Sequence, residues 1–385
     1  TKGDMRVLYI ITVRGHGSGG HFHSLNHISH AMGQQIDVGI CSYGTGNSKV
    51  LENNPYFLEH IPFNGYNFLI FISQLKKLLK KFNPEIVHCF DITAYNIFTL
   101  FFNQNKCSIF LNKCGGSNPK YFPLVQNLVL FSKENKKWFQ NNSKFNETNI
   151  ALIPNRVNPN VLKFDFKKLI KKENAFCFVR IARIGSAYKK SIEDSIRLIG
   201  HLKEKGLNVH LYIIGAIQDE NLVLELKKKI KSLPITLITD SEYTIKASDM
   251  LYLADAVIAT GRGIMEGTSL GKPILTPANN SKYPILVDDT NFKDFFKTNF
   301  SERNTASQES IKENMSRIFS IIQNKVDYEK LEVFSKNSFD KCFSTETGIP
   351  QYLKFYRLNL NSNKIKFNRF KNLVFELKAM YSFLK

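Results

Sequence analysis

Short apolar runs alternate with helical stretches along this sequence, and the whole pattern begins a second time after residue 172. Apolar runs of this length are typical of buried strands, and hydrophobic residues three and four apart indicate helices between them. Strands that alternate with helices form parallel sheets covered on both faces. The chain has 385 residues, more than one hydrophobic core usually serves. The sequence therefore predicts two α/β domains.

The first domain is expected to contain strands at residues 6–13, 36–41, 85–90, 109–112, 128–131 and 151–154. A helix is expected at residues 21–32, with Gly33 as its C-cap, and another from residue 68 to Asn83-Pro84. Residues 155–172 are basic and polar, as linkers are.

The second domain is expected to contain strands at residues 175–182, 209–215, 235–238, 256–259 and 272–275. Helices are expected at residues 191–205 and 221–232, and the pattern is helical beyond residue 291, with a last helix from about residue 365. Two doubly wound units bind ligands at the carboxyl ends of their strands.

The composition favours anionic partners, because the formal net charge is +20. The six cysteines contain no Cys-x-x-Cys pair, so reduced thiols are expected rather than a disulfide framework. No apolar run reaches the roughly 20 residues of a membrane span, and the N-terminus does not resemble a signal peptide.

A glycine loop, Gly17-Ser18-Gly19-Gly20, lies between the first predicted strand and helix. Glycines let backbone N–H groups approach a ligand, and a helix N-terminus attracts negative charge. The alternative is a tight turn with no ligand. His16 and His21 flank the loop and are candidates for contact with an acceptor. His23 and His27 lie four residues apart but lack a third ligand, so no metal site is predicted.

Cations follow the first strand of the second domain, where Arg183, Lys189 and Lys190 are expected in the loop before a helix. A guanidinium fork beside a point charge suits a diphosphate. Solvated turn lysines are the alternative.

A second glycine loop follows the predicted strand at residues 256–259. A short helix is expected to begin near Gly263 and to hold Glu266 in its first turn. Glu266 could then bind a ribose diol while the N–H groups near Gly263 face phosphate. An acid in a first helical turn is also favourable without any ligand.

Several segments, taken in order, resemble those of glycosyltransferases with the GT-B fold, and among these the retaining family 4. They are Gly19-Gly20 before a helix, Pro84-Glu-Ile-Val-His88, Ile153-Pro-Asn-Arg-Val-Asn158, Ala182-Arg183 to Lys189-Lys190, Tyr212-Ile-Ile-Gly215, and Ala254-Asp255 through Glu266 to Pro273.

The resemblance implies two Rossmann-like domains that face a central cleft. Residues 1–160, completed by a C-terminal helix at about 345–385, would form the acceptor domain, and residues 161–344 the donor domain. The enzyme would transfer a hexose from a UDP- or GDP-sugar to a glycan or lipid-linked acceptor, without a cofactor or metal ion.

The resemblance also implies residue roles. Arg183 and Lys189 would stabilise the departing nucleotide, with His16 as a further catalytic candidate. The donor would also contact Gly19, Gly20, Lys190, Gly215, Arg262, Gly263 and Glu266. The acceptor would contact His21, Gly115 and Gly116.

Three positions depart from the family pattern. Ile258 stands where the family has a first glutamate that contacts the donor sugar, and the loop from Asp255 to Glu266 is shortened. Arg156 replaces the usual glycine of the hinge segment. Arg262, in the shortened loop, is a candidate to take over a donor contact.

Basic residues beside apolar helix stripes suggest peripheral contact with an anionic membrane at its cytoplasmic face. They are Lys76, Lys77, Lys80 and Lys81, and in the last helix Lys364, Lys366, Arg369, Lys371 and Lys378. Solvated helix faces over ordinary core are the alternative. Such contact would fit capsule or lipopolysaccharide synthesis.

Other functions remain open. A basic nucleic-acid-binding protein would share the charge, but the chain has no recognisable binding module, so no nucleic-acid partner is predicted. A sugar-nucleotide epimerase, a glycogen-synthase-like polymerase or an inactive homologue would share the fold.

Overall fold

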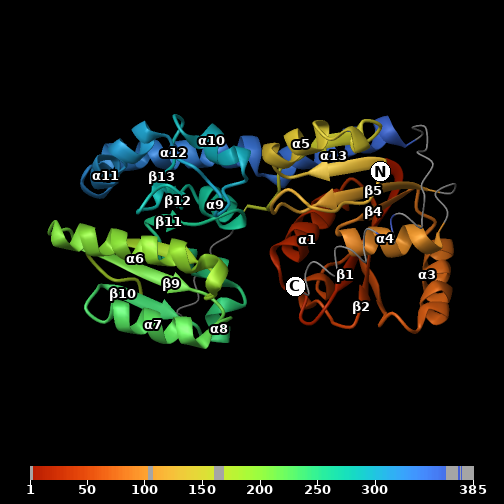
Figure 1. Cartoon of the computed structure of the whole chain (residues 1–385), viewed down its shortest axis with the longest axis horizontal. Helices are drawn as coiled ribbons and strands as arrows, with labels where there is room; N and C mark the ends of the chain where they lie inside the picture. The colour runs from red at the N-terminus through yellow and green to blue at the C-terminus, as the bar shows by residue number, and fades with distance from the viewer. Residues whose placement is uncertain (1–2, 103–106, 160–168, 361–371, 373, 375–385) are drawn as a thin grey trace. The chain divides into compact units, whose positions relative to one another are not determined.

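The chain forms two compact units in a computed structural model that describes residues 3–102, 107–159, 169–360, 372 and 374 (Figure 1). Unit 1 comprises Thr1–Asn158 and Thr345–Lys385, and unit 2 comprises Pro159–Ser344. The boundaries drawn from the sequence lie within two residues of these.

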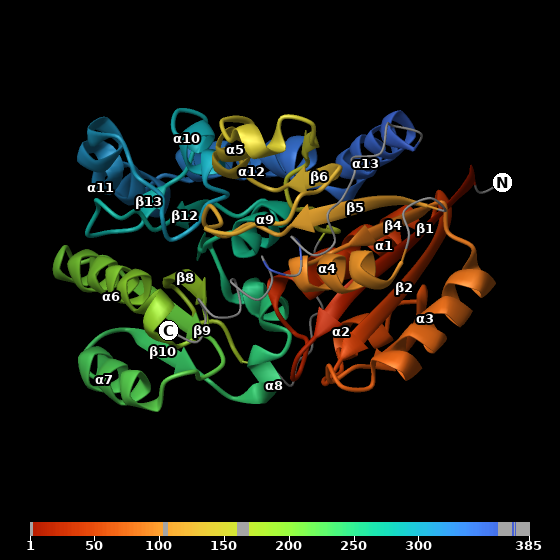
Figure 2. The same ribbon diagram turned by 45° about the vertical axis from the view of Figure 1, so that its right-hand side comes forward.

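A parallel sheet of seven strands forms the centre of unit 1. Its order is β3 (Phe57–Pro62), β2 (Ile36–Gly44), β1 (Gly3–Val13), β4 (Ile86–Cys89), β5 (Ser108–Lys113), β6 (Asn127–Leu130) and β7 (Asn149–Leu152). Figure 2 shows β2, β1, β4 and β5 side by side.

Helices cover both faces of this sheet because its central strands are apolar on both sides. In β1, Leu8 and Ile10 join the core on one face, while Val7 and Tyr9 join the core on the other. The first face carries α3 (Phe68–Phe82), α4 (Ile92–Phe101), α5 (Lys133–Gln140) and the 3-10 helix η1 (Ser143–Phe145). The second carries α1 (Gly20–Met32), α2 (Lys49–Glu52) and α13 (Thr345–Asn359).

A buried polar chain fastens α13 to the sheet of unit 1. The hydroxyl of Tyr356 lies 2.6 Å from Nδ1 of His88 and 3.1 Å from the hydroxyl of Tyr9. Tyr352 donates a hydrogen bond to Asn112 over 3.3 Å. All these residues are buried, and burial lowers the pKa of His88 to about 3. The C-terminal helix is therefore an integral layer of unit 1.

Arg156, the replacement for the hinge glycine, serves this helix as well. Its guanidinium donates to Oγ1 of Thr347 over 3.2 Å, and its side chain packs where a Cβ at position 348 would stand. Gly348 leaves room for it.

Unit 2 contains a sheet of six strands, parallel except for its last pair. Its order is β10 (Ile235–Ile238), β9 (Val209–Ile214), β8 (Phe176–Ile181), β11 (Ala256–Ile258), β12 (Ile274–Thr276) and the antiparallel β13 (Ile285–Leu286). One face packs on α6 (Lys189–Glu204), α7 (Glu220–Ile230) and α11 (Gln308–Gln323). The other elements are η2 (Ser186–Tyr188), α8 (Ser241–Thr244), η3 (Ala247–Leu253), α9 (Arg262–Ser269), α10 (Phe292–Lys297) and α12 (Lys325–Cys342).

Most expected elements are present, with two informative differences. Gly33 does cap α1, but its φ is −66°, so a left-handed backbone conformation does not explain why glycine occurs there. A Cβ there would lie 2.2 Å from the ring of Tyr56. The expected last helix, from about residue 365, lies outside the described residues apart from Asn372 and Val374.

The thiol and membrane predictions can be compared with the structure. No disulfide joins the six cysteines, all of which lie in described ranges. Within the described ranges, each helix is too short or too polar to cross a bilayer.

Candidate functional site

The predicted donor residues of unit 2 gather at the carboxyl edge of its sheet. Arg183 follows β8, Gly215 follows β9, and Arg262 and Gly263 follow β11. The strand order reverses between β8 and β11, because β9 and β10 lie on one side of β8 while β11 and β12 lie on the other. Such a reversal is where open α/β sheets bind ligands.

Arg183 is an exposed cation held by an aromatic ring. Its guanidinium carbon lies 5.3 Å from the centre of the Tyr188 ring, and Nη2 donates to the Tyr188 hydroxyl over 3.0 Å. Stacking restricts the side chain while leaving other N–H groups of the fork at the surface. Arg183 is thus prepared to bind an anion.

Lys189 and Lys190 do not lie in the loop, and that expectation is wrong. They are the first two residues of α6. Cations at a helix N-terminus are unfavourable, and each lysine has a carboxylate partner here. Lys189 binds Glu225 over 2.7 Å, and Lys190 binds the buried carboxylate of Asp194 over 2.6 Å.

The surroundings of these lysines differ. Lys189 and Lys229 hold Glu225 by hydrogen bonds, which lower the pKa of that exposed carboxyl to about 2. Lys190 instead also reaches the carbonyl oxygens of Ala278 and Ser281, over 3.2 and 3.1 Å. Lys190 therefore spans to the loop beyond β12, whereas Lys189 joins α6 to α7.

Glu266 does not lie in the first turn of its helix, so this expectation is also wrong. Because α9 begins at Arg262, Glu266 lies one turn further along. The Nε of Arg262 donates to Oε1 of Glu266 over 2.8 Å, and both side chains are largely buried. The predicted ribose ligand and the predicted donor-sugar contact are therefore partners of each other.

A charged cluster that the sequence did not reveal lies at the end of β8. Arg180 is fully buried and donates to Oγ of Ser191 over 2.7 Å and to Oε1 of Glu302 over 3.1 Å. Ser191 Oγ also lies 2.9 Å from that oxygen of Glu302. Burial raises the pKa of Glu302, although the nearby Arg180 charge opposes this shift.

Glu302 lies close in sequence to a segment that contacts the shortened loop. The N–H of Gly261 donates to the carbonyl of Phe300 over 2.9 Å. Phe300 has φ of 52°, a strained conformation for a bulky residue. No sequence signal links Glu302 to Arg180, since 122 positions separate them.

Packing alone requires a glycine at position 215, whether or not a ligand binds there. A Cβ there would stand 1.7 Å from the carbonyl oxygen of Ala182. The ends of β8 and β9 therefore approach too closely for any side chain.

The first glycine loop lies at the matching reversal in unit 1, between β1 and β4. Gly17 has φ of 41°, and a Cβ there would stand 2.7 Å from the Cβ of Ser48. Gly19 precedes α1 as its N-cap, and an added Cβ at Gly20 would meet no atom within 4 Å. Gly17 is thus needed for packing, whereas Gly20 leaves open space at a helix N-terminus.

The other predicted residues of unit 1 are spread out. His16 is exposed, and His21 is half-buried against Phe22 at 4.3 Å between rings, where burial lowers its pKa. Gly115 and Gly116 follow β5, with φ of 74° and 78°. They therefore lie at the end of β5, one strand away from the reversal between β1 and β4.

The histidines of α1 do not gather metal ligands. The Nδ1 of His27 accepts a hydrogen bond from the N–H of Asn158 over 2.7 Å. Within the part of the chain that the structure describes, no three His, Cys, Asp or Glu side chains are grouped to hold a metal ion.

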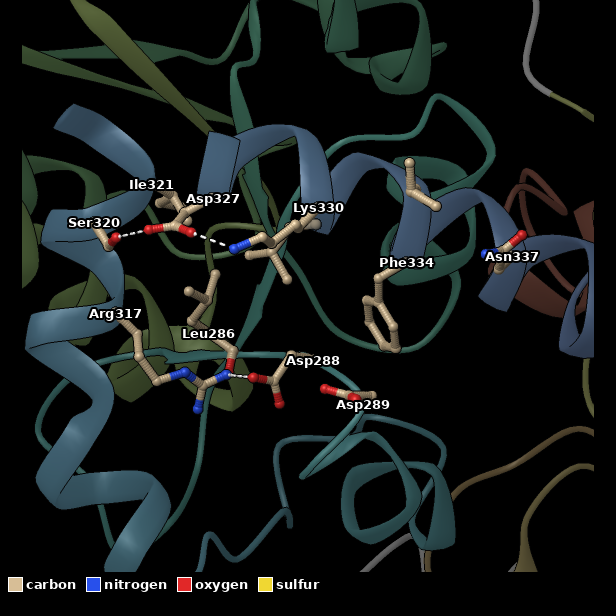
Figure 3. A pocket seen from close by; sticks show the side chains of 12 residues that line it. Leu286, Asp288, Asp289, Arg317, Ser320, Ile321, Asp327, Lys330, Phe334 and Asn337 are labelled. Carbon is tan, nitrogen blue, oxygen red and sulfur yellow. Dashed lines mark hydrogen bonds and ion pairs between the residues drawn. The ribbon is translucent and has the colours of Figure 1, made fainter. Parts of the chain in front are cut away.

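A separate cavity of about 560 Å³ lies in unit 2 beside α11 and α12 (Figure 3). Arg317 pairs with Asp288 on its wall, and Asp327 binds Lys330 over 3.0 Å. Because β13 is antiparallel to β12, the chain beyond Leu286 runs toward the amino ends of the parallel strands. This cavity is therefore not part of the predicted donor site.

Comparison with known protein families gives a match within the first unit. Residues 6–133 match the family described as glycosyl transferase 4-like. The matched residues lie within unit 1. Among curated proteins, no sequence matches the chain.

Solved structures match nearly the whole chain. A glycosyltransferase from Rickettsia africae ESF-5 is 17% identical, with 93% of this chain and 99% of that chain covered and a TM-score of 0.65. Anabaena Alr3699/HepE, in complex with UDP and glucose, is 13% identical, with 92% and 100% covered and a TM-score of 0.63. A UDP-GlcNAc 2-epimerase from Neisseria meningitidis is 14% identical, with 92% and 100% covered and a TM-score of 0.56.

The predicted relationship to glycosyltransferases is confirmed by the family match, and the predicted GT-B fold by the structures. At these identities the structures show the fold alone. Retention of configuration, and the residues that bind the donor, stay predictions.

Proposed function

We propose that this chain is a glycosyltransferase that moves a sugar from a nucleoside-diphosphate sugar to an acceptor hydroxyl. The observation that carries the proposal is the arrangement in unit 2, where the loops after β8, β9 and β11 bring Arg183, Gly215 and Arg262 to one reversal of strand order. The family match of unit 1 supports the same reaction.

Arg183 is the residue we assign to the donor diphosphate. In the reaction the acceptor oxygen bonds to the anomeric carbon and its hydroxyl proton is released, while the bond from that carbon to the phosphate oxygen breaks and the electron pair leaves with the nucleotide. A guanidinium at the phosphate stabilises this developing charge. Lys189 and Lys190 contribute in the proposal only by exchanging their carboxylate partners for phosphate.

The ribose is assigned to Glu266. Its carboxylate already accepts from Arg262, which orients it while leaving acceptor capacity for a diol. The donor is proposed to be a UDP-sugar, since HepE, with the same fold, is solved in complex with UDP and glucose.

The acceptor is proposed to be a glycan or lipid-linked sugar of a cell-surface polysaccharide, made at the cytoplasmic face of a membrane. A lipopolysaccharide outer core galactosyltransferase is among the proteins with this fold. The net charge of +20 supports an anionic acceptor or surface.

The proposal is tested by incubating the full chain with radiolabelled UDP- and GDP-sugars and a glycolipid extract. We expect one donor to release its nucleotide and to transfer label to the extract, and Arg183→Ala to slow both about a hundredfold. Label that reaches no acceptor with any donor would contradict transfer. Proton NMR of the product then reports whether the anomeric configuration is retained.

An epimerase is the second candidate, because a UDP-GlcNAc 2-epimerase shares the fold. An epimerase converts the nucleotide sugar to its epimer without an acceptor and transfers no sugar. Donor converted to its epimer in the absence of extract would therefore favour this alternative.

A further inference from the structure

Unit 1 has a cavity of about 560 Å³ beside the reversal of strand order. The ends of β1 and β2, the loop after β3 and the first turn of α3 surround it, together with α4. Its volume is in the range of small-molecule sites. The lining residues are Thr12, Val13, Arg14, Tyr43, Gly44, Thr45, Phe63, Asn64, Gly65, Phe68, Thr93, Ile97, Leu100 and Phe101.

The exposed surface of this cavity is mostly apolar, although Thr12, Thr45, Asn64 and Thr93 also lie along it. The Tyr43 hydroxyl donates to the carbonyl of Ala94 over 2.6 Å, so it is already engaged. Phe63 and Phe101 line the cavity, and the buried ring of Phe71 packs behind them, 4.4 Å from Phe63 and 6.4 Å from Phe101 between ring centres. A sugar requires many polar partners, whereas a hydrocarbon chain requires apolar contact and gains free energy by leaving water.

One cation stands at this cavity. Arg14 is the single charged side chain among its described lining residues, and it is exposed directly after the end of β1. His16 and the glycine loop follow it in sequence. A ligand whose chain fills the cavity would therefore place an anionic head group at Arg14, beside the predicted acceptor residues.

The surface beside the cavity is apolar and then basic. Tyr66, Leu69 and Ile70 are 90%, 72% and 62% exposed around the start of α3. Further along the same helix Lys76, Lys77, Lys80 and Lys81 are exposed, while Phe71, Leu75 and Leu78 form core. Exposed apolar side chains next to lysines suit an anionic lipid surface, where the apolar side chains enter the acyl region and the ammonium groups meet phosphates.

We propose that this cavity binds the hydrocarbon chain of a lipid phosphate, with Arg14 on its phosphate and the start of α3 against the membrane that supplies it. The proposal rests on the proposed function in one respect, since it makes this lipid the carrier of the acceptor.

The test uses the full chain and tritiated farnesyl phosphate, below its micelle concentration, in equilibrium dialysis. Leu100→Trp fills the cavity, and Leu224→Trp adds the same bulk at an exposed apolar position of unit 2. We expect Leu100→Trp to weaken binding about tenfold or more, because buried apolar area is lost, and Leu224→Trp to leave it unchanged. Arg14→Ala should weaken farnesyl phosphate about tenfold and farnesol little.

Equal affinity of the wild type and Leu100→Trp for farnesyl phosphate would overturn the proposal. So would loss of binding in Leu69→Ser with Ile70→Ser but not in Leu100→Trp, since that pattern indicates adsorption to the surface alone. UDP binding is measured on the same samples. Normal UDP binding without lipid binding removes only this inference, and lipid binding without UDP binding removes only the proposed transferase.

Discussion

The two units have the same kind of sheet and the same reversal of strand order, yet their carboxyl edges differ in chemistry. The edge of unit 2 gathers guanidinium and ammonium groups, including Arg183, Lys190 and Arg262, and holds the two latter in ion pairs. The edge of unit 1 has a glycine loop, an apolar cavity and one exposed guanidinium, that of Arg14.

One sheet topology can therefore support two kinds of recognition. Paired cations can exchange a protein carboxylate for a phosphate at little cost, so unit 2 is suited to a charged donor. An apolar cavity with a cation at its rim recognises an amphiphile, so unit 1 is suited to a carrier with a hydrocarbon part.

The largest effect is expected for Gly215→Ala in unit 2. The new Cβ would stand 1.7 Å from the Ala182 carbonyl oxygen, so β8 and β9 must separate. We expect a loss of about 3 kcal/mol or more in the free energy of unfolding of unit 2. Calorimetry measures it. Gly200→Ala, in α6 with its nearest atom 3.9 Å away, is the control, and an equal effect from both would refute the close approach.

The second largest effect is expected for Arg183→Ala, which tests whether unit 2 binds the donor. We expect kcat/KM for the nucleotide sugar to fall about a hundredfold, roughly 2.7 kcal/mol of transition-state stabilisation. Arg183→Lys should recover part of this, because a point charge replaces the fork. Lys203→Ala, an exposed change at the far end of α6, should leave kcat/KM unaltered.

The stability of unit 1 should depend on pH through the buried His88. Burial lowers the pKa of His88 to about 3, whereas an unfolded histidine titrates near 6.5. The unfolded chain thus gains a proton below pH 6.5 that the native state refuses until about pH 3. The free energy of unfolding is therefore highest above pH 6.5 and decreases as the pH falls towards 3. The decrease is about 1.4 kcal/mol at pH 5.5.

Urea unfolding at pH 7.5 and 5.5 checks this expectation. His88→Asn should lose most of the pH-dependent difference, and Tyr356→Phe should keep it, since it removes the hydrogen-bond partner but no group that titrates in this range. An unchanged difference in His88→Asn would assign the pH effect to another group.

The smallest effect is expected for Gly20→Ala in unit 1. An added Cβ meets no atom within 4 Å, so the substitution should stabilise unit 1 by about 0.5 kcal/mol through the unfolded chain. Thermal unfolding measures the stability and nucleotide release the activity. A lower transfer rate in this more stable variant would place a ligand at Gly20, and an unchanged rate would leave that glycine to the turn.

Periodicity predicted the two sheets, because buried strands and amphipathic helices repeat at different spacings. It missed α4 (Ile92–Phe101), which has no charged residue and whose polar Asn96 and Thr99 are themselves buried, so no charged, exposed face marks the helix. It also missed β3, an edge strand with mixed burial that ends at Pro62. Local spacing has no information about elements of these two kinds.

The candidate site could be predicted only in part. Arg183 and the glycine loops follow strands, and position relative to a strand can be read from sequence. The pairing of Arg180 with Glu302 depends on segments 122 residues apart, and only the folded chain brings them together. The start of α6 at Lys189 could not be predicted either. A cation is unfavourable at a helix N-terminus, and the charge of Lys189 is offset by Glu225, which only the folded chain brings near.

The carboxyl edge of unit 2 is proposed to bind a nucleoside diphosphate. Isothermal titration of UDP into the full chain and into Arg183→Ala and Glu266→Ala tests it most directly. We expect one site per chain in the wild type and much weaker binding in both variants, with GDP as the alternative ligand. Undiminished binding in both variants, or no binding of either nucleotide by the wild type, would contradict it.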